Sequence, residues 1–127
     1  MFFMLPHLLL VDDDPLFCQL MELGARQMGF RITTCNSGRD FSQLPDLRFF
    51  DVAVVDHFFG DLKGEDVAPY FAEMPVILVS ANRECLKDSP HWPKCIKFFV
   101  DKSSGIPTIL KAAYESAGMH RAQLHPV

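Results

Sequence analysis

Five short runs of apolar residues recur along the chain of 127 residues, and segments with helical spacing lie between them. Several of the runs are continuous and do not alternate with polar residues, as is typical of strands buried on both faces. Strands that alternate with helices predict an α/β fold in which helices cover both faces of a parallel sheet. The expected strands are Leu8–Val11, Phe30–Thr34, Val52–Val55, Val76–Val79 and Ile96–Val100.

The first and last helices have the clearest start and stop signals in the sequence. Asp14 can cap the first, Pro15 suits its first turn, and Gly29 is a plausible stop. The last is predicted to open at Pro107 and to end at Gly118. Residues at helical spacing are Leu16, Leu20, Leu23 and Gln27, beside Phe17, Met21 and Met28, in the first helix, and Ile109, Leu110, Ala113 and Ala117 in the last. Shorter helices are expected at residues 38–44, 65–73 and 82–88.

The composition excludes several classes of protein. With 49% hydrophobic and 22% charged residues, the chain is expected to be one soluble globular domain over residues 1–127. The formal net charge of -4 and the lack of any Lys/Arg run argue against a nucleic-acid surface. The apolar start falls short of the roughly 20 residues that span a bilayer and has no cationic n-region. The four cysteines form no CxxC pair, so we expect reduced, buried thiols in a cytoplasmic protein.

Polar side chains follow four of the predicted strands at the point where each strand ends. Asp12 and Asp13 follow the first strand, and Asp56 follows the third. Ser80 and Lys102 follow the fourth and fifth strands. In open α/β sheets ligands bind beyond the carboxyl ends of the strands. If the sheet brings these four strands together, the five side chains meet at one crevice.

The chemistry of such a crevice is that of phosphoryl transfer. Three close carboxylates repel one another, and Mg²⁺ would offset that cost because it prefers carboxylate and water oxygens. The Ser80 hydroxyl and the Lys102 ammonium group both suit phosphate oxygens. Phosphoryl transfer to an Asp carboxylate needs positioning and charge neutralisation, which these groups would supply.

The same residues resemble the receiver domain of two-component response regulators, over about Leu5 to Gly118. The acidic pair lies in LLLVDDDP, the phosphoacceptor in DVAVVDHFFGDLKG, the hydroxyl residue in VILVSA and the lysine in FFVDKSSG. Phe99 stands three residues before the lysine, at the place of the family's aromatic switch residue. Gly64, eight residues after Asp56, fits the usual loop glycine.

The resemblance implies a flavodoxin-like (βα)5 three-layer sandwich whose five-stranded parallel sheet has the order 2-1-3-4-5. It implies that Asp56 accepts a phosphoryl group from a phosphohistidine of a histidine kinase or histidine phosphotransfer domain. It also implies Mg²⁺ as the cofactor, bound by Asp13, Asp56 and the backbone carbonyl of Phe58, with Asp12 acting largely through water. Such a domain is not a classical enzyme and catalyses only its own phosphorylation and dephosphorylation.

The resemblance further implies a two-state switch. Ser80 would move to the phosphoryl group and draw in Phe99, which would reshape the face built around the fourth helix and fifth strand. Lys102 would pair with Asp56 and then with the phosphoryl group. Partners would be proteins, and the family allows a homodimer; neither direct nucleic-acid binding nor a membrane is expected.

The chain departs from the family pattern in three places. Ser103 follows the lysine where many relatives have a proline, often after a cis bond. Gly60 stands four residues after Asp56, where a proline is usual. The segment from Gly64 to Pro75 is short, so the third helix should lose a turn or more.

Two other functions compete with this interpretation. A receiver-like domain that no longer takes phosphate could act only as a protein-interaction module, and the missing proline, the short third helix and the bulky apolar Phe58 favour it. A Mg²⁺-dependent phosphatase of the haloacid-dehalogenase type also uses Asp, Ser/Thr and Lys. In that family, however, an acidic pair follows the lysine in sequence, and after Lys102 this chain offers only Glu115. Among the remaining polar residues, Asp14 is expected to be a helix cap and His57 a solvated loop residue.

Overall fold

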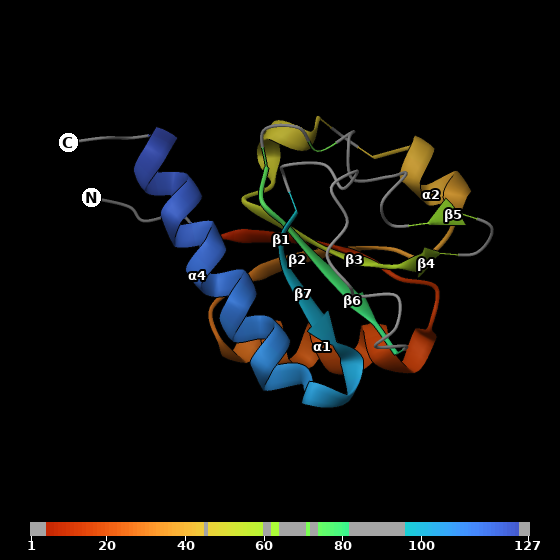
Figure 1. The fold of residues 1–127 in the computed structure, drawn as a ribbon. Helices are drawn as coiled ribbons and strands as arrows, with labels where there is room; N and C mark the ends of the chain where they lie inside the picture. Colours follow the sequence, from red (N-terminus) through yellow and green to blue (C-terminus); the bar gives the residue numbers. More distant parts are fainter. Residues whose placement is uncertain are drawn as a thin grey trace.

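The computed structural model describes residues 5–44, 46–59, 62–63, 71, 74–81 and 96–124. Five strands form one parallel sheet with the order β2-β1-β3-β6-β7, and two more form a short antiparallel pair, β4-β5 (Figure 1). Since β6 and β7 are the fourth and fifth strands of the large sheet, the predicted order 2-1-3-4-5 is confirmed. The strands are β1 His7–Val11, β2 Arg31–Cys35, β3 Val52–Asp56, β4 Phe58–Phe59, β5 Leu62–Lys63, β6 Val76–Ser80 and β7 Ile96–Asp101.

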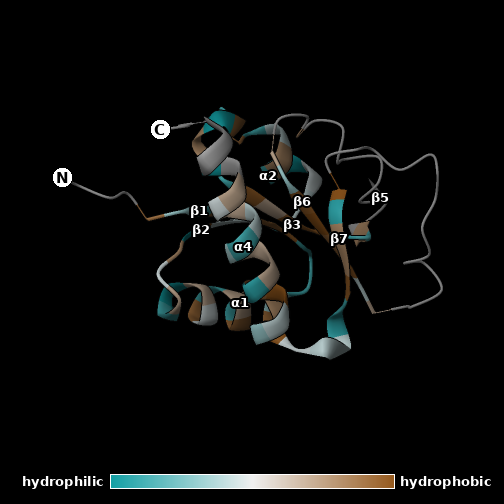
Figure 2. Cartoon of the chain, turned by 60° about the vertical axis from the view of Figure 1, so that its left-hand side comes forward, coloured by the Kyte–Doolittle hydropathy of each residue, from teal (hydrophilic) through white to brown (hydrophobic). Residues whose placement is uncertain are grey.

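Helices cover both faces of this sheet and give the expected three-layer sandwich. Figure 1 shows α1 and α4 side by side on one face, with α2 on the other. Side chains alternate across a strand, so each strand supplies both cores, and β3 and β6 are hydrophobic along their length in Figure 2. The helices are α1 Pro15–Gln27, α2 Gly38–Ser42 and α4 Ile106–Leu124, with 3-10 turns η1 Leu47–Phe49 and η4 Lys102–Ser104. The core under α1 and α4 includes Leu8, Leu10, Phe17, Met21, Val52, Val54, Ile77, Val79, Ile109 and Leu110, and the opposite core includes Leu9, Val11, Ala53, Val55, Phe71, Val76 and Leu78.

Helix α1 has the predicted ends. Asp14 is its N-cap, and its side-chain oxygen accepts hydrogen bonds from the Leu16 and Phe17 N–H groups at 3.0 and 3.3 Å. Pro15 occupies the first turn, and Gly29 follows the C-cap with a φ of 90°, a conformation that favours glycine. The cap ties the start of α1 to the carboxyl end of β1.

The buried face of α1 is narrower than its apolar sequence indicates. The side chains of Phe17, Cys18, Met21 and Ala25 lie in the core. The leucines at helical spacing face solvent instead, and Leu16, Leu20 and Leu23 are 64%, 47% and 58% exposed. Cys18 and Ala25 are small enough to let the helix approach the sheet closely, which favours their face over the leucine face.

Helix α4 is longer than predicted. Its buried residues Ile109, Leu110, Ala113 and Ala117 are those expected, but the prediction that Gly118 ends it is wrong. A glycine inside a helix costs only about 1 kcal/mol. A tertiary contact offsets that cost, because Arg121 Nε lies 3.0 Å from Asp51 Oδ1 near the start of β3.

Gly24 and Gly118 provide a matched test of the packing between α1 and α4. A Cβ atom at Gly24 would lie 2.7 Å from Leu110 Cδ1 and 3.2 Å from Ile106 Cγ2, whereas at Gly118 it would meet no described atom within 4 Å. Gly118→Ala should therefore raise the free energy of unfolding by about 0.5–1 kcal/mol. Gly24→Ala should lower it by about 1–2 kcal/mol, because overpacking outweighs the gain in helix propensity. Urea unfolding measures both, and an equal gain from both variants would contradict this packing.

The short helices and the cysteines predicted from the sequence fall only partly within the described residues. Helix α2 is shorter than the predicted 38–44, and apart from Phe71 the helices predicted at 65–73 and 82–88 lie outside the described residues, as does Gly60. Cys18 and Cys35 are buried free thiols; Cys85 and Cys95 lie outside the described residues. None of the described helices combines the length and apolar character needed to cross a bilayer.

Candidate functional site

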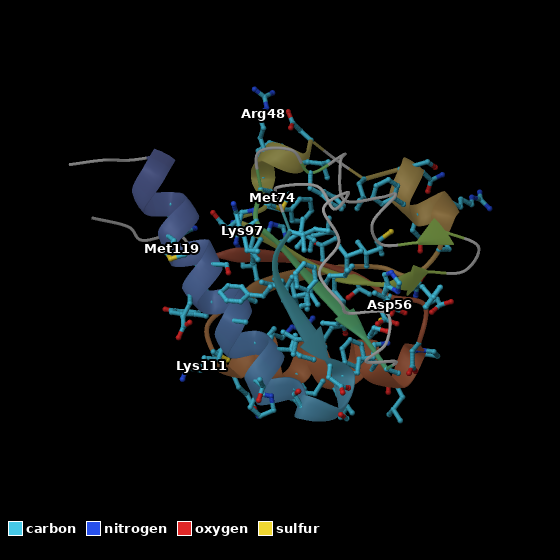
Figure 3. All side chains as sticks on the ribbon, viewed as in Figure 1. Arg48, Asp56, Met74, Lys97, Lys111 and Met119 are labelled. Carbon is cyan, nitrogen blue, oxygen red and sulfur yellow. The ribbon has the colours of Figure 1, made fainter. Side chains whose placement is uncertain are left out.

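Three carboxylates gather at the carboxyl end of the parallel sheet. Asp12 directly follows β1, and Asp56 ends the neighbouring strand β3, where Val11 pairs with Val55. One carboxylate oxygen from each of Asp12, Asp13 and Asp56 lies within 4.8 Å of the others. Figure 3 shows Asp56 at this end of the sheet. Asp12 and Asp56 are buried and Asp13 is exposed, so the cluster opens to solvent on the Asp13 side.

Short contacts hold Asp12 in place. Its Oδ1 accepts a hydrogen bond from the Asp14 N–H at 2.9 Å, and its own N–H donates to the Cys35 carbonyl at 3.1 Å. The Cys18 thiol donates to the Asp12 carbonyl at 3.3 Å. The Asp12 backbone is thus held by the end of β2 and by Cys18 of α1, and its carboxylate is held by the N-cap residue of α1.

Lys102 supplies the positive charge of the cluster. Its Nζ lies 2.8 Å from Asp12 Oδ2 and 3.5 Å from Asp56 Oδ2, and its side chain is only 18% exposed. The same nitrogen lies 4.5 Å from the centre of the Phe17 ring. The resemblance implied pairing with Asp56, and the structure adds Asp12 as the closer partner.

Burial is the largest influence on the pKa of each of these groups. Burial raises the pKa of Asp56 to about 6, the charge of Asp12 adds to the rise, and Lys102 and a hydrogen bond from the Phe58 backbone oppose it. Burial also raises the pKa of Asp12, against hydrogen bonds from Lys102 and the Asp14 backbone. For Lys102, burial lowers the pKa, but the hydrogen bond and charge of Asp12 outweigh it and the net shift is upward.

The donor set fits a hard divalent cation. Fully ionised, three carboxylates and one ammonium group leave a charge of about -2, and all the close donors are oxygens, which Mg²⁺ prefers. Phe58 follows Asp56 by two residues and begins β4, where it pairs with Lys63 of β5. The β4-β5 pair has no signal in the sequence, because each strand has only two residues.

Ser80 lies on β6, which pairs with β3, and Phe99 lies on β7, the edge strand on the other side of β6. Ser80 ends β6 and is buried. Val76 and Leu78, which point to the same face of β6 as Ser80, belong to the core opposite α1. Phe99 pairs with Leu78 across β6 and β7 and packs on that same core. The two predicted switch residues therefore share a face of the sheet.

The expectation that His57 is a solvated loop residue is wrong. His57 is 6% exposed, and its N–H donates to the Val79 carbonyl at 2.7 Å, so the pairing of β3 with β6 continues through it. Its ring contacts that of Phe58 edge-on with centres 4.5 Å apart, and its Nδ1 has no hydrogen-bond partner among the described residues. Phe58 is half-exposed beside it.

The turn after Lys102 forms without the proline of many relatives. The bond between Lys102 and Ser103 is trans, and the chain enters the 3-10 turn η4. Asp101 caps this turn, since its Oδ1 accepts a hydrogen bond from the Ser103 N–H at 2.9 Å. The hydrogen bond from Ser103 to the Asp101 side chain, an Asx-type cap, thus fixes the turn in place of a proline.

Comparisons with known proteins support the fold. No protein-family model matches the chain. The transcriptional activator protein PfeR of Pseudomonas aeruginosa is 32% identical over 79 residues, which are 60% of this chain and 26% of that protein. The match therefore spans about a quarter of that relative's length.

Two solved structures share most of the architecture. A response regulator receiver domain (CheY-like) from Methylobacillus flagellatus has a TM-score of 0.74 at 18% identity, over 89% of this chain and 98% of that one. The response regulator protein TrrA from Thermotoga maritima, in complex with Mg²⁺-BeF, has a TM-score of 0.73 at 18% identity, over 87% of this chain and 98% of that one. The chain therefore has the fold of the response regulator receiver domains.

Proposed function

We propose that the chain is a response regulator receiver domain over residues 1–127, with Asp56 as its phosphoacceptor. The convergence of three carboxylates and the Lys102 ammonium group at the carboxyl end of a receiver-type sheet carries this proposal. The phosphoryl group would come from a phosphohistidine of a histidine kinase or histidine phosphotransfer domain in the cytoplasm. A fold shared with a structure that contains Mg²⁺-BeF supports the cofactor.

The residues divide the chemistry among them. Asp13, Asp56 and the Phe58 carbonyl would hold Mg²⁺, with Asp12 acting through water, and the bound cation would neutralise charge on the transferring phosphoryl group. An Asp56 carboxylate oxygen attacks phosphorus, the new O–P bond forms as the N–P bond to histidine breaks, and the leaving imidazole retains the electron pair and takes a proton. Lys102 stabilises the charge on the phosphoryl oxygens.

The signal would leave through the sheet edge that carries the switch residues. A phosphoryl group on Asp56 offers hydrogen-bond acceptors to Ser80, which ends the adjacent strand β6. Movement of Ser80 frees space toward Phe99 on β7, on the same side of the sheet. The face built by β7, the last helix α4 and the helix predicted at residues 82–88, which lies outside the described residues, would then change shape and meet an output domain, a target protein or a second copy of the chain.

The test is adduct formation in the presence of Mg²⁺. With acetyl phosphate the intact chain should gain one phosphoryl group by mass spectrometry, and beryllofluoride should shift the amide resonances around Asp56. Asp56→Asn should abolish both signals, whereas Asp40→Asn, at an exposed carboxylate of α2, should leave them intact. If the unaltered chain shows neither adduct nor shifts, the phosphoacceptor proposal fails and the interaction-module function takes its place.

A further inference from the structure

The Lys102 ammonium group has a third neighbour besides the two carboxylates. The Phe17 ring lies beneath it, with 4.5 Å between Nζ and the ring centre. Phe17 comes from the first turn of α1 and is itself 9% exposed. A cation over an aromatic face is attracted by the ring quadrupole, and the attraction grows when both groups are shielded from water.

We propose that Phe17 is a positioning residue that holds the Lys102 ammonium group over the site through its ring face. The proposal rests on the proposed function, because the position matters for a phosphoryl group on Asp56. Lysine has a flexible four-carbon stem and loses much rotamer entropy when fixed in one place. A contact that keeps the ammonium group in the site therefore reduces the rotamer entropy that is lost when Lys102 contacts a phosphoryl oxygen.

The ring contact differs in kind from the two ion pairs. A divalent cation among Asp12, Asp13 and Asp56 would compete with Lys102 for carboxylate oxygens. It would not compete for the ring, which offers no oxygen ligand. The ammonium group can thus stay beside the site when its attraction to Asp12 and Asp56 weakens.

The position of the ring is set by the same backbone that positions the carboxylates. The Phe17 N–H donates to the cap residue Asp14, whose own N–H donates to Asp12 Oδ1. Two consecutive hydrogen bonds therefore connect the residue that lies beneath the ammonium group to the carboxylate that pairs with it. A leucine at position 17 would fill much of the same core volume but would have no π face.

Nuclear magnetic resonance gives a direct readout of the contact. Protons over an aromatic face are shifted upfield by the ring current, so the ε-methylene protons of Lys102 should resonate upfield in the unaltered chain. Phe17→Leu should remove this shift, and Phe17→Tyr, which keeps the ring, should retain it. Met21→Leu is the matched control, since Met21 is buried on the same face of α1 and changes only packing.

The binding of beryllofluoride at saturating Mg²⁺ measures the consequence. Phe17→Leu should weaken it by about 3-fold to 30-fold, the range expected for a partly buried cation–π contact. Phe17→Tyr and Met21→Leu should stay within about twofold of the unaltered chain, as small packing changes predict. If Phe17→Leu does not fold, Phe17→Met tests the same loss of the ring.

The outcomes separate this inference from the proposed function. If the unaltered chain does not bind beryllofluoride at all, the proposed function fails, and the Lys102 ring-current shift still decides whether Phe17 holds the ammonium group. If Phe17→Leu leaves both the Lys102 resonances and the beryllofluoride affinity unchanged, the positioning role is overturned. If Met21→Leu weakens binding as much as Phe17→Leu, the effect is one of packing, and the role is likewise overturned.

Discussion

Replacing Lys102 by methionine is expected to destabilise the metal-free chain by about 3–5 kcal/mol near neutral pH. The buried Asp12 carboxylate has its closest ion pair with Lys102, at 2.8 Å, and Asp56 has a second at 3.5 Å. Methionine keeps much of the apolar stem but leaves these carboxylates without the ammonium charge. Urea unfolding in the presence of a chelator measures the loss. Lys111→Met, at an exposed position of α4, should change the free energy of unfolding by less than about 0.5 kcal/mol.

Mg²⁺ should rescue the Lys102→Met variant. A ligand that binds only the folded state stabilises it in proportion to the logarithm of its concentration over Kd. Without the ammonium group the three carboxylates attract a divalent cation more strongly, so the same Mg²⁺ concentration should stabilise the variant more than the unaltered chain. Equal stability of the two chains in chelator, or no rescue by Mg²⁺, would show that Lys102 is not the internal counter-charge of this cluster.

The centre of the sheet could be predicted because β1, β3 and β6 are buried on both faces and their sequences are therefore almost continuously apolar. The ends of β1, β3, β6 and β7 fall within one residue of the predicted ends. The end of α4 could not be predicted in this way. Gly118 is a local stop signal, whereas the contact that extends the helix joins Arg121 to Asp51, 70 residues apart. Sequence patterns report local preference, and a long-range ion pair is invisible to them.

In the site, too, the positions of residues along the strands could be predicted, whereas their long-range contacts could not. Asp12, Asp56 and Lys102 could be brought together from sequence, since each follows a strand and parallel strands end at one edge. The contacts that these three residues make could not be predicted from the sequence. That Asp12 is the closer carboxylate to Lys102, and that Phe17 lies beneath the ammonium group, depend on side-chain directions that strand position leaves open. The burial of His57 depends likewise on how far the pairing of β3 with β6 continues.

Asp56→Asn is expected to stabilise the metal-free chain by up to about 3 kcal/mol at about pH 7.5. The folded-state pKa of Asp56 is about 6 against an ordinary value of 3.8, so the folded state binds the proton more tightly than the unfolded state does. Between these two values the folded chain carries more protons, and its stability falls as pH rises. Below about pH 4 both states are protonated and the contribution is fully present; above about pH 6 it has been lost. Asparagine does not titrate, so the free energy of unfolding of the variant does not fall with the ionisation of residue 56.

The pH dependence of the difference between the two chains distinguishes this cause from a general packing effect. The gain in the free energy of unfolding should grow between about pH 4 and pH 6 and then level off, as linkage requires. Asp40→Asn, at an exposed carboxylate, should show no such growth. Mg²⁺ should reverse the order, because the cation stabilises the ionised carboxylate of the unaltered chain and has lost a ligand in the variant. A gain of the same size at every pH would mean that Asp56 is not strained by its burial beside Asp12. The need for a cation at this end of the sheet would then rest on the positions of the oxygens alone.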